Sequence, residues 1–234
     1  MIRRLSIVAA SALVFAIITL SIAGVTGGSE VATYIGKHGA IVWDDNDDDA
    51  RISRSLTFDP TKALEIDAPV RIDFTRGAQV SMEARAAPKL MQALSWKDGH
   101  LTLDGSGGPF HGTIRLKIVA PQMPVLTING PGNVELHDLQ QDAFKLNLSG
   151  PGNIEASGKV HTLAVNASGA GNLDLESLEA TDAQVHVSGL GNVDLSVTGK
   201  LEADISGAGN ISLHRKPTVI NSSISGIGNI SHDY

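Results

Sequence analysis

The second half of the chain repeats a short motif, Ser-Gly-x-Gly-Asn, at nearly constant spacing, with Asn129 in place of the serine in the first copy. The final asparagine of the motif recurs at intervals of 20, 19, 20, 18 and 19 residues. A fixed period near 20 with turn residues in phase is typical of a solenoid, in which each repeat forms one coil that stacks on the next. The repeated asparagines are Asn133, Asn153, Asn172, Asn192, Asn210 and Asn229.

Apolar and polar residues alternate on both sides of each motif. Around Asn172, for example, Val165, Ala167, Leu173 and Leu175 are separated by polar or small residues, and nearly every copy follows the same pattern. Alternation with a period of two is expected of a strand with one buried face. A single coil cannot bury that face alone, but stacked coils bury it against equivalent residues above and below. The pattern therefore predicts an all-β fold, a parallel β-helix (solenoid) with coils of about 19 residues.

The glycines and the asparagine of the motif suit a corner between two strands. Glycine adopts backbone conformations that a side chain would hinder, and asparagine bonds nearby backbone groups readily. Because each asparagine has the same phase, we expect the six to line up at one corner and form a structural turn ladder of amides. Ligand binding by these asparagines is the less favoured interpretation.

Composition limits both the core and the partners. Apolar residues make up 42% of the chain but aromatic residues only 4%, so the core must be built from Val, Ile, Leu and Ala. The net charge of −7 argues against a nucleic-acid partner. The chain has no cysteine, which excludes disulfides, thiolate catalysis and cysteine-ligated metals.

The N-terminus predicts export. Arg3 and Arg4 precede an uncharged apolar run, and Ser21 and Ala23 place small residues where a signal peptidase would cut. Residues 1–23 are therefore either a cleaved signal peptide or an N-terminal membrane anchor. Residues 24–54 are predicted to form an acidic linker, and residues 55–234 the β-helical domain. Within that domain, shorter strands are expected between residues 64 and 119, with a short helical or irregular segment at 86–96.

The repeated motif, together with the segment from Ile118 to Gly130, resembles the "putative auto-transporter adhesin, head GIN domain" family. The resemblance covers roughly residues 56–234. The resemblance implies a right-handed parallel β-helix on an exported protein. It provides no catalytic residues that could be assigned to positions of this chain.

A stripe of carboxylates follows the motif, two residues after each of four asparagines. Stacking would bring these side chains to within about 5 Å of one another. One interpretation is a solvated acidic face, and the other is a stripe that binds a divalent cation such as Ca²⁺. The histidines of the repeats differ in phase or lie coils apart, so we expect no other metal site and no further cofactor. The stripe consists of Glu135, Glu155, Asp174 and Asp194.

These features predict a non-enzymatic exported protein of the periplasm or cell surface, an adhesin or interaction module that presents a rigid β-helix face to a protein or glycan of the envelope. The alternatives are a scaffold anchored to the membrane through residues 5–23 and, less favoured, a glycan-acting β-helix enzyme. The repeats are poor in aromatic sugar platforms, which argues against the enzyme. The last coil is followed only by Ser231 to Tyr234, so an open strand edge is also expected to allow edge-mediated homo-oligomers.

Overall fold

The computed structural model describes residues 51–104 and 112–234. The predicted signal or anchor segment (residues 1–23) lies outside these residues, as does the predicted linker up to residue 50. Strand β1 (Ile52–Leu56) begins inside the last residues assigned to that linker. Across the described ranges, no helix is both long and apolar enough to cross a bilayer.

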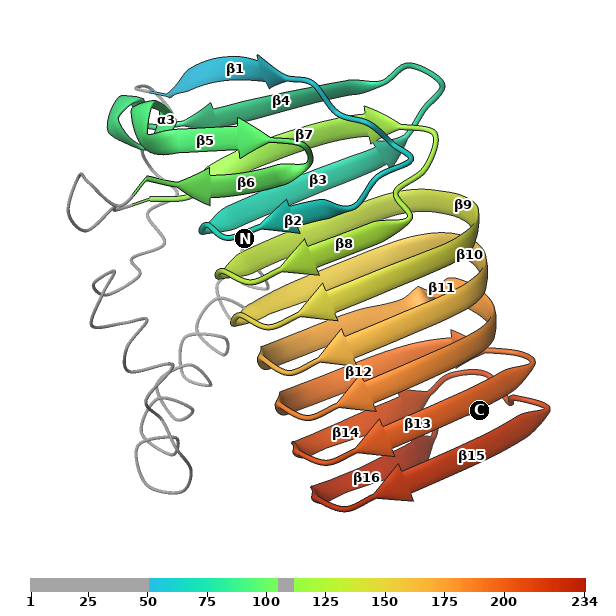
Figure 1. Ribbon diagram of the computed structural model, residues 1–234. Helices are drawn as coiled ribbons and strands as arrows, with labels where there is room; N and C mark the ends of the chain where they lie inside the picture. Colours follow the sequence, from blue (N-terminus) through green and yellow to red (C-terminus); the bar gives the residue numbers. More distant parts are fainter. Residues whose placement is uncertain (1–50, 105–111) are drawn as a thin grey trace, which may run out of the picture. The chain divides into compact units, whose positions relative to one another are not determined.

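The repeat region forms a parallel β-solenoid of about five turns with coils of about 20 residues, which confirms the predicted fold class (Figure 1). Successive coils pair in parallel along their length. The long strands bend around the coils, and in the last turns they divide into shorter ones. These strands are β9 (Gly132–Leu148), β10 (Gly152–Ala167), β11 (Ala170–Val187), β12 (Leu190–Val197), β13 (Lys200–Ile205), β14 (Ala208–Leu213), β15 (Val219–Ile224) and β16 (Ile227–His232).

The first rungs of the solenoid are stacked out of chain order. Strand β3 (Val70–Arg76) lies between β7 (Ile114–Ala120) and β9, although it precedes both in the sequence. On the neighbouring face, β2 (Leu64–Ile66) likewise lies between β6 (His100–Leu103) and β8 (Val125–Ile128). All four pairings are parallel, so these rungs continue the stack that the repeats form.

Antiparallel strands close the N-terminal end of the stack. Strand β4 (Ser81–Ala86) pairs antiparallel with β7 and with β1, and β5 (Leu94–Lys97) forms a hairpin with β6. A short helix, α3 (Pro88–Ala93), joins β4 to β5 and lies within the segment 86–96 that the sequence marks as helical or irregular. Its Leu90 and Met91 are buried. The end of the solenoid is thus covered by strands that do not continue its parallel pattern (Figure 1).

The core consists of aliphatic rows that run from coil to coil. Equivalent apolar residues pair across neighbouring strands, such as Val165 with Val185 and Leu173 with Val193. The third side of the coils is filled by Leu139, Val160 and Leu178, all at least 96% buried. Burial of side chains in rows supplies the hydrophobic stabilisation that one coil cannot obtain alone.

The motif glycines allow the corners of successive coils to approach closely. Gly169 N–H donates to the carbonyl of Leu148 at 3.1 Å, and Leu190 N–H donates to the carbonyl of Gly169 at 3.0 Å. A Cβ atom on Gly171 would collide with the carbonyl oxygen of Gly152 in the preceding coil. Ala170 and Leu190, which lie between the two glycines of neighbouring coils, are only partly buried, so side chains of different size fit at this position.

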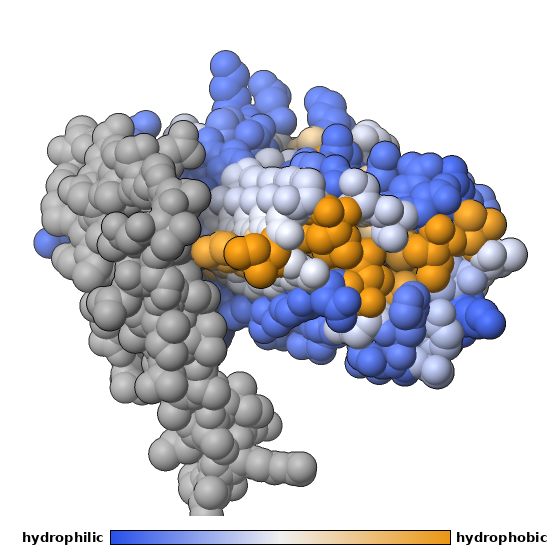
Figure 2. All heavy atoms as spheres, turned by 90° about the horizontal axis from the view of Figure 1, so that it is seen from below, coloured by the Kyte–Doolittle hydropathy of each residue, from blue (hydrophilic) through white to orange (hydrophobic). Residues whose placement is uncertain are grey.

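The C-terminal end of the solenoid is open. The aliphatic rows that are buried in the preceding coil are exposed or half-exposed in the last coil, which contains β15 and β16. Figure 2 looks at the molecule from this side and shows apolar side chains gathered between hydrophilic margins. Val219, Ile224 and Ile227 are among the large apolar side chains that are exposed here.

Replacement of Gly171 by alanine should destabilise the fold by about 2 kcal/mol or more, because the added methyl group meets the backbone of the neighbouring coil and not a movable side chain. Replacement of Ala170 by leucine, the residue at the equivalent position of the next coil, is the matched control and should change stability little. Urea unfolding followed by circular dichroism measures both. Equal stability of G171A and the parent protein would show that the coils are not packed this closely.

Candidate functional site

The carboxylate stripe forms a continuous column on one outer face. Glu135, Glu155, Asp174 and Asp194 pair in register across β9, β10, β11 and β12. Asp73 of β3 pairs with Glu135 and adds a fifth carboxylate, which the repeat pattern could not reveal because β3 precedes the repeats. We call these five side chains the acidic column. Ser212 and Ser231 occupy the equivalent positions in the last two coils.

Neighbouring groups interact with parts of the acidic column. His137 Nε2 lies 3.8 Å from Glu135 Oε2, and His214 Nε2 lies 3.5 Å from Asp194 Oδ1. Asp174 Oδ1 accepts a hydrogen bond from the backbone N–H of Glu176 at 3.3 Å. The carboxylates are spaced as parallel strands are, about 4.8 Å apart, so neighbouring charges repel in water by roughly 1 kcal/mol before screening. Cation binding by this column remains a prediction.

A second outer face carries a row of polar side chains that runs from the first rungs to the last. The strands pair these residues in register, from β6 through β2, β8 and the later halves of the coils to β15. We call it the polar row. Its members are His100, Glu65, Thr127, Asn147, Asn166, His186, Asp204 and Ser223.

Hydrogen bonds connect several members of the polar row. Asn147 Nδ2 donates to Thr127 Oγ1, and Asn166 Nδ2 donates to Asn147 Oδ1, both at 2.9 Å. Farther along, His186 Nδ1 lies 3.1 Å from Asp204 Oδ2. These contacts hold exposed side chains in one orientation, so the row presents donors and acceptors at fixed positions.

The six motif asparagines also stand in register, from Asn133 in β9 to Asn229 in β16. Contacts between them are long: Asn210 Nδ2 donates to Asn192 Oδ1 at 3.3 Å, and the backbone N–H of Asn172 donates to Asn153 Oδ1 at 3.4 Å. The amide contacts of Asn147 and Asn166 in the polar row are shorter, at 2.9 Å. A purely structural role for the motif asparagines remains our proposal.

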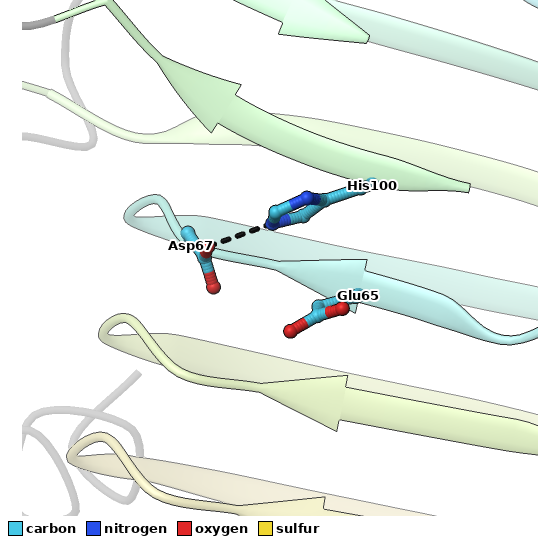
Figure 3. Close-up of side chains that lie close together, drawn as sticks. All are labelled: Glu65, Asp67 and His100. Carbon is cyan, nitrogen blue, oxygen red and sulfur yellow. Dashed lines mark hydrogen bonds and ion pairs between the residues drawn. The ribbon is translucent and has the colours of Figure 1, made fainter. Parts of the chain in front are cut away.

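A cluster of different polar side chains lies at the N-terminal end of the polar row. Glu65, Asp67 and His100 each offer a ligand atom, and these atoms lie within 4.8 Å of one another (Figure 3). His100 Nε2 lies 2.7 Å from Asp67 Oδ2. On the other side, Asn129 Nδ2 donates to Asp67 Oδ1 at 2.6 Å and to Glu65 Oε1 at 3.1 Å.

The stacking of β6, β2 and β8 creates this cluster. Leu64 and Ile66 of β2 point into the core, so Glu65 and the next alternate residue, Asp67, lie on the outer face. His100 comes from β6 on one side of β2, and Asn129 follows β8 on the other. The sequence does show the alternation of Glu65 and Asp67, but it does not show that His100, 33 residues away from Asp67, becomes a neighbour.

A shallow surface hollow of about 360 Å³ lies at the third corner of the coils. Charged side chains line it, and among them Glu179 lies 3.6 Å from Lys159 Nζ and 3.4 Å from Arg215 Nη2. Glu179 therefore pairs with both of the cationic side chains that line the hollow.

Comparisons with known proteins agree on one family and one fold. The model of the family described as "Putative auto-transporter adhesin, head GIN domain" matches residues 61–217. The chain resembles the crystal structure of a putative adhesin from Bacteroides fragilis with a TM-score of 0.60 at 17% identity, over 79% of this chain and 97% of that one. No curated protein matches the chain in sequence.

Two further solved structures show weaker likeness, each over 79% of this chain and 97% of the other. One is a putative lipid binding protein from Parabacteroides distasonis, with a TM-score of 0.48 and 19% identity. The other is a putative adhesin from Parabacteroides merdae, with a TM-score of 0.40 and 16% identity.

Neutralisation of Glu155 should stabilise the protein at low ionic strength, because this carboxylate lies between Glu135 and Asp174 in the acidic column. The E155Q variant should gain a few tenths of a kcal/mol, roughly the size of an exposed charge pair, and lose the gain in 1 M salt. Thermal melts at both salt concentrations measure the difference.

Glu202 provides the matched control, because Lys200 pairs with it and the pKa of Lys200 is raised by that hydrogen bond and charge. E202Q should therefore fail to stabilise. A gain for E155Q that persists in high salt would contradict repulsion as the cause. A calcium titration of the parent protein tests the alternative, since an unchanged melting temperature at millimolar calcium removes cation binding by the column.

Proposed function

Because the chain belongs to the family described as "Putative auto-transporter adhesin, head GIN domain", we propose that it is an exported, non-enzymatic protein of the cell envelope that binds its partner through the polar row of the solenoid. The observation that carries this proposal is the register of eight polar side chains along one face. A row of that length spans roughly 34 Å, taking about 4.8 Å per strand. Such a surface suits an extended partner, a protein or glycan strand, better than a small molecule.

The fixed orientation of the polar row favours binding. Side chains that are already hydrogen-bonded, such as Asn147 and Asn166, lose less conformational freedom when a partner binds. The parallel strands beneath them are held by main-chain pairing, so the spacing of the row does not change on contact. Binding energy is therefore not spent on ordering the surface.

The interior of the coils supports a surface mode of binding. A void between the corner glycines and the aliphatic side chains Leu148 and Leu173 has a volume of only about 10 Å³. Room of that size does not admit an organic ligand. A partner of this region of the solenoid meets its outside.

Export is a separate part of this proposal. It is supported by the basic and then apolar N-terminus and by the family description. The mass of the protein recovered from the envelope distinguishes cleavage after Ala23 from retention of residues 1–23 as an anchor. A retained segment would favour the scaffold held at the membrane.

Substitution in the polar row should abolish partner binding. Asn166 is a member of the polar row, and Gln184 lies two residues before the member His186, on the same face of the next coil. Both side chains are exposed, and N166R/Q184R places two bulky cations on this face. The matched control, E155R/D174R, places two arginines in neighbouring coils of the acidic column. Both variants and the parent are immobilised and exposed to envelope proteins and to a glycan array, and bound material is quantified.

The expected result is loss of binding, by tenfold or more, for the polar-row variant alone. Loss only in the acidic-column variant would assign binding to the other face. If both variants bind as the parent does, the outer faces are not the binding surface. Circular dichroism checks that both variants keep the strand content of the parent.

The open end of the solenoid provides a second contact surface, and we propose that a second copy of the chain covers it. The last coil presents unpaired main-chain groups along β15 and β16, which are a template for further strand pairing. The same coil exposes its aliphatic rows, and a two-fold arrangement would bring these identical apolar rows together (Figure 2).

Replacement of Ile224 by lysine (I224K) should dissociate such a dimer, because it buries one uncompensated charge from each copy in the contact. Val80 lies in the N-terminal cap and is exposed to nearly the same extent, 44% against 45% for Ile224, so V80K is the control. Light scattering after size exclusion should show a dimer for the parent and for V80K, and a monomer for I224K. A monomeric parent at high concentration would contradict the dimer.

A further inference from the structure

We propose that Glu65, Asp67 and His100 form a binding site for a divalent transition-metal ion of the zinc class. The cluster combines two carboxylates and one imidazole, which are ligands that Zn²⁺ accepts in proteins. Among the described residues, it is the group of three such side chains whose ligand atoms come within 4.8 Å of one another. This inference is independent of the binding proposed for the rest of the polar row.

The distances suit a small ion. Ligand atoms at about 2.1 Å from a tetrahedral zinc ion are about 3.4 Å from one another. The ligand atoms of the cluster already lie within 4.8 Å of one another, and Asp67 Oδ2 and His100 Nε2 are 2.7 Å apart. Both side chains are more than a third exposed, so small rotations about their side-chain bonds can adjust these distances.

The two oxygens of Asp67 have different partners. Oδ1 accepts a hydrogen bond from Asn129 Nδ2, and Oδ2 faces His100. The same amide nitrogen of Asn129 donates to Glu65 Oε1, so one amide group orients both carboxylates. A hydrogen-bond donor behind the ligands is the arrangement that fixes carboxylates at metal sites. Asn129 is therefore a positioning residue, and water would complete the coordination.

Electrostatics also favour a cation here. Glu65 of β2 and Asp67, which directly follows β2, lie on the same outer face, and the hydrogen bonds from Asn129 do not cancel their charge. A divalent ion would neutralise both and would replace the contact between Asp67 and His100. Imidazole as the third ligand favours zinc over calcium, which prefers oxygen ligands only.

His214 also lies near two carboxylates, but their arrangement does not allow all three side chains to bind one metal ion. Its Nδ1 lies 3.7 Å from Glu176, and its Nε2 lies 3.5 Å from Asp194. Because the two carboxylates approach opposite nitrogens of the ring, they cannot converge with it on one ion. His214 therefore serves as the matched control for His100.

The test uses the untagged chain, freed of metal by dialysis against a chelator and then titrated with ZnCl₂ in a calorimeter. We expect one zinc ion per chain, and a loss of affinity of at least about tenfold for H100A. H214A should bind zinc as the parent does. The imidazole signal of His100 should shift with one equivalent of zinc in NMR spectra, whereas that of His214 should not.

D67N is a second variant that keeps the shape of the side chain and removes one charge, and it should also lose zinc affinity. If H100A fails to fold, D67N decides the matter. Absence of zinc binding, unchanged affinity in D67N, or equal loss in H214A would overturn the proposal. Calcium is titrated in the same way, and tighter binding of calcium than of zinc would show that the imidazole is not a ligand.

Discussion

In-register main-chain pairing between successive coils is the constraint on which the rest of this structure depends. Each strand of a coil bonds the equivalent strand above and below, so residue types that share a phase are brought into contact. The corner must therefore be narrow enough for the backbones to meet, and the motif glycines provide that closeness where Gly171 lies against Gly152. The same register aligns the aliphatic side chains of successive coils into rows, so contacts between neighbouring coils are enough to form the core.

Stacking also turns each exposed position into a column, with consequences that depend on the residue type. A repeated asparagine can bond its copy in the next coil, as Asn147 and Asn166 do. Carboxylates repeated in neighbouring coils repel instead, as Glu155 does between Glu135 and Asp174, a repulsion that these amides avoid. The two outer faces of one solenoid thus differ in charge and in hydrogen bonding, although both are built by the same alternation.

The solenoid was predictable from the sequence because its information is local and repeated: the phase of Asn153, Asn172 and Asn192 determines both the register and the buried rows. The order of the first rungs was not predictable, since β2 and β3 stack between strands that come later in the chain. Alternation identified strands near Leu64 and His100 but carries no information about which strand pairs with which. The acidic column was foreseen in its repeated part, and Asp73 was missed for the same reason.

The region that departs from the repeat is also the region where different side chains converge. Within the repeats, some columns present one residue type several times, as the motif asparagines do. The two carboxylates near His214 approach opposite nitrogens of its ring and do not converge on one point. The rungs β6, β2 and β8 come from three separate segments, so His100, Glu65 and Asn129 bring three different chemistries to one outer position. Register still sets their spacing, because these rungs are parallel like the others. The convergence of two carboxylates and an imidazole therefore arises at the end of the stack where the chain order is broken, while the repeats supply long outer faces.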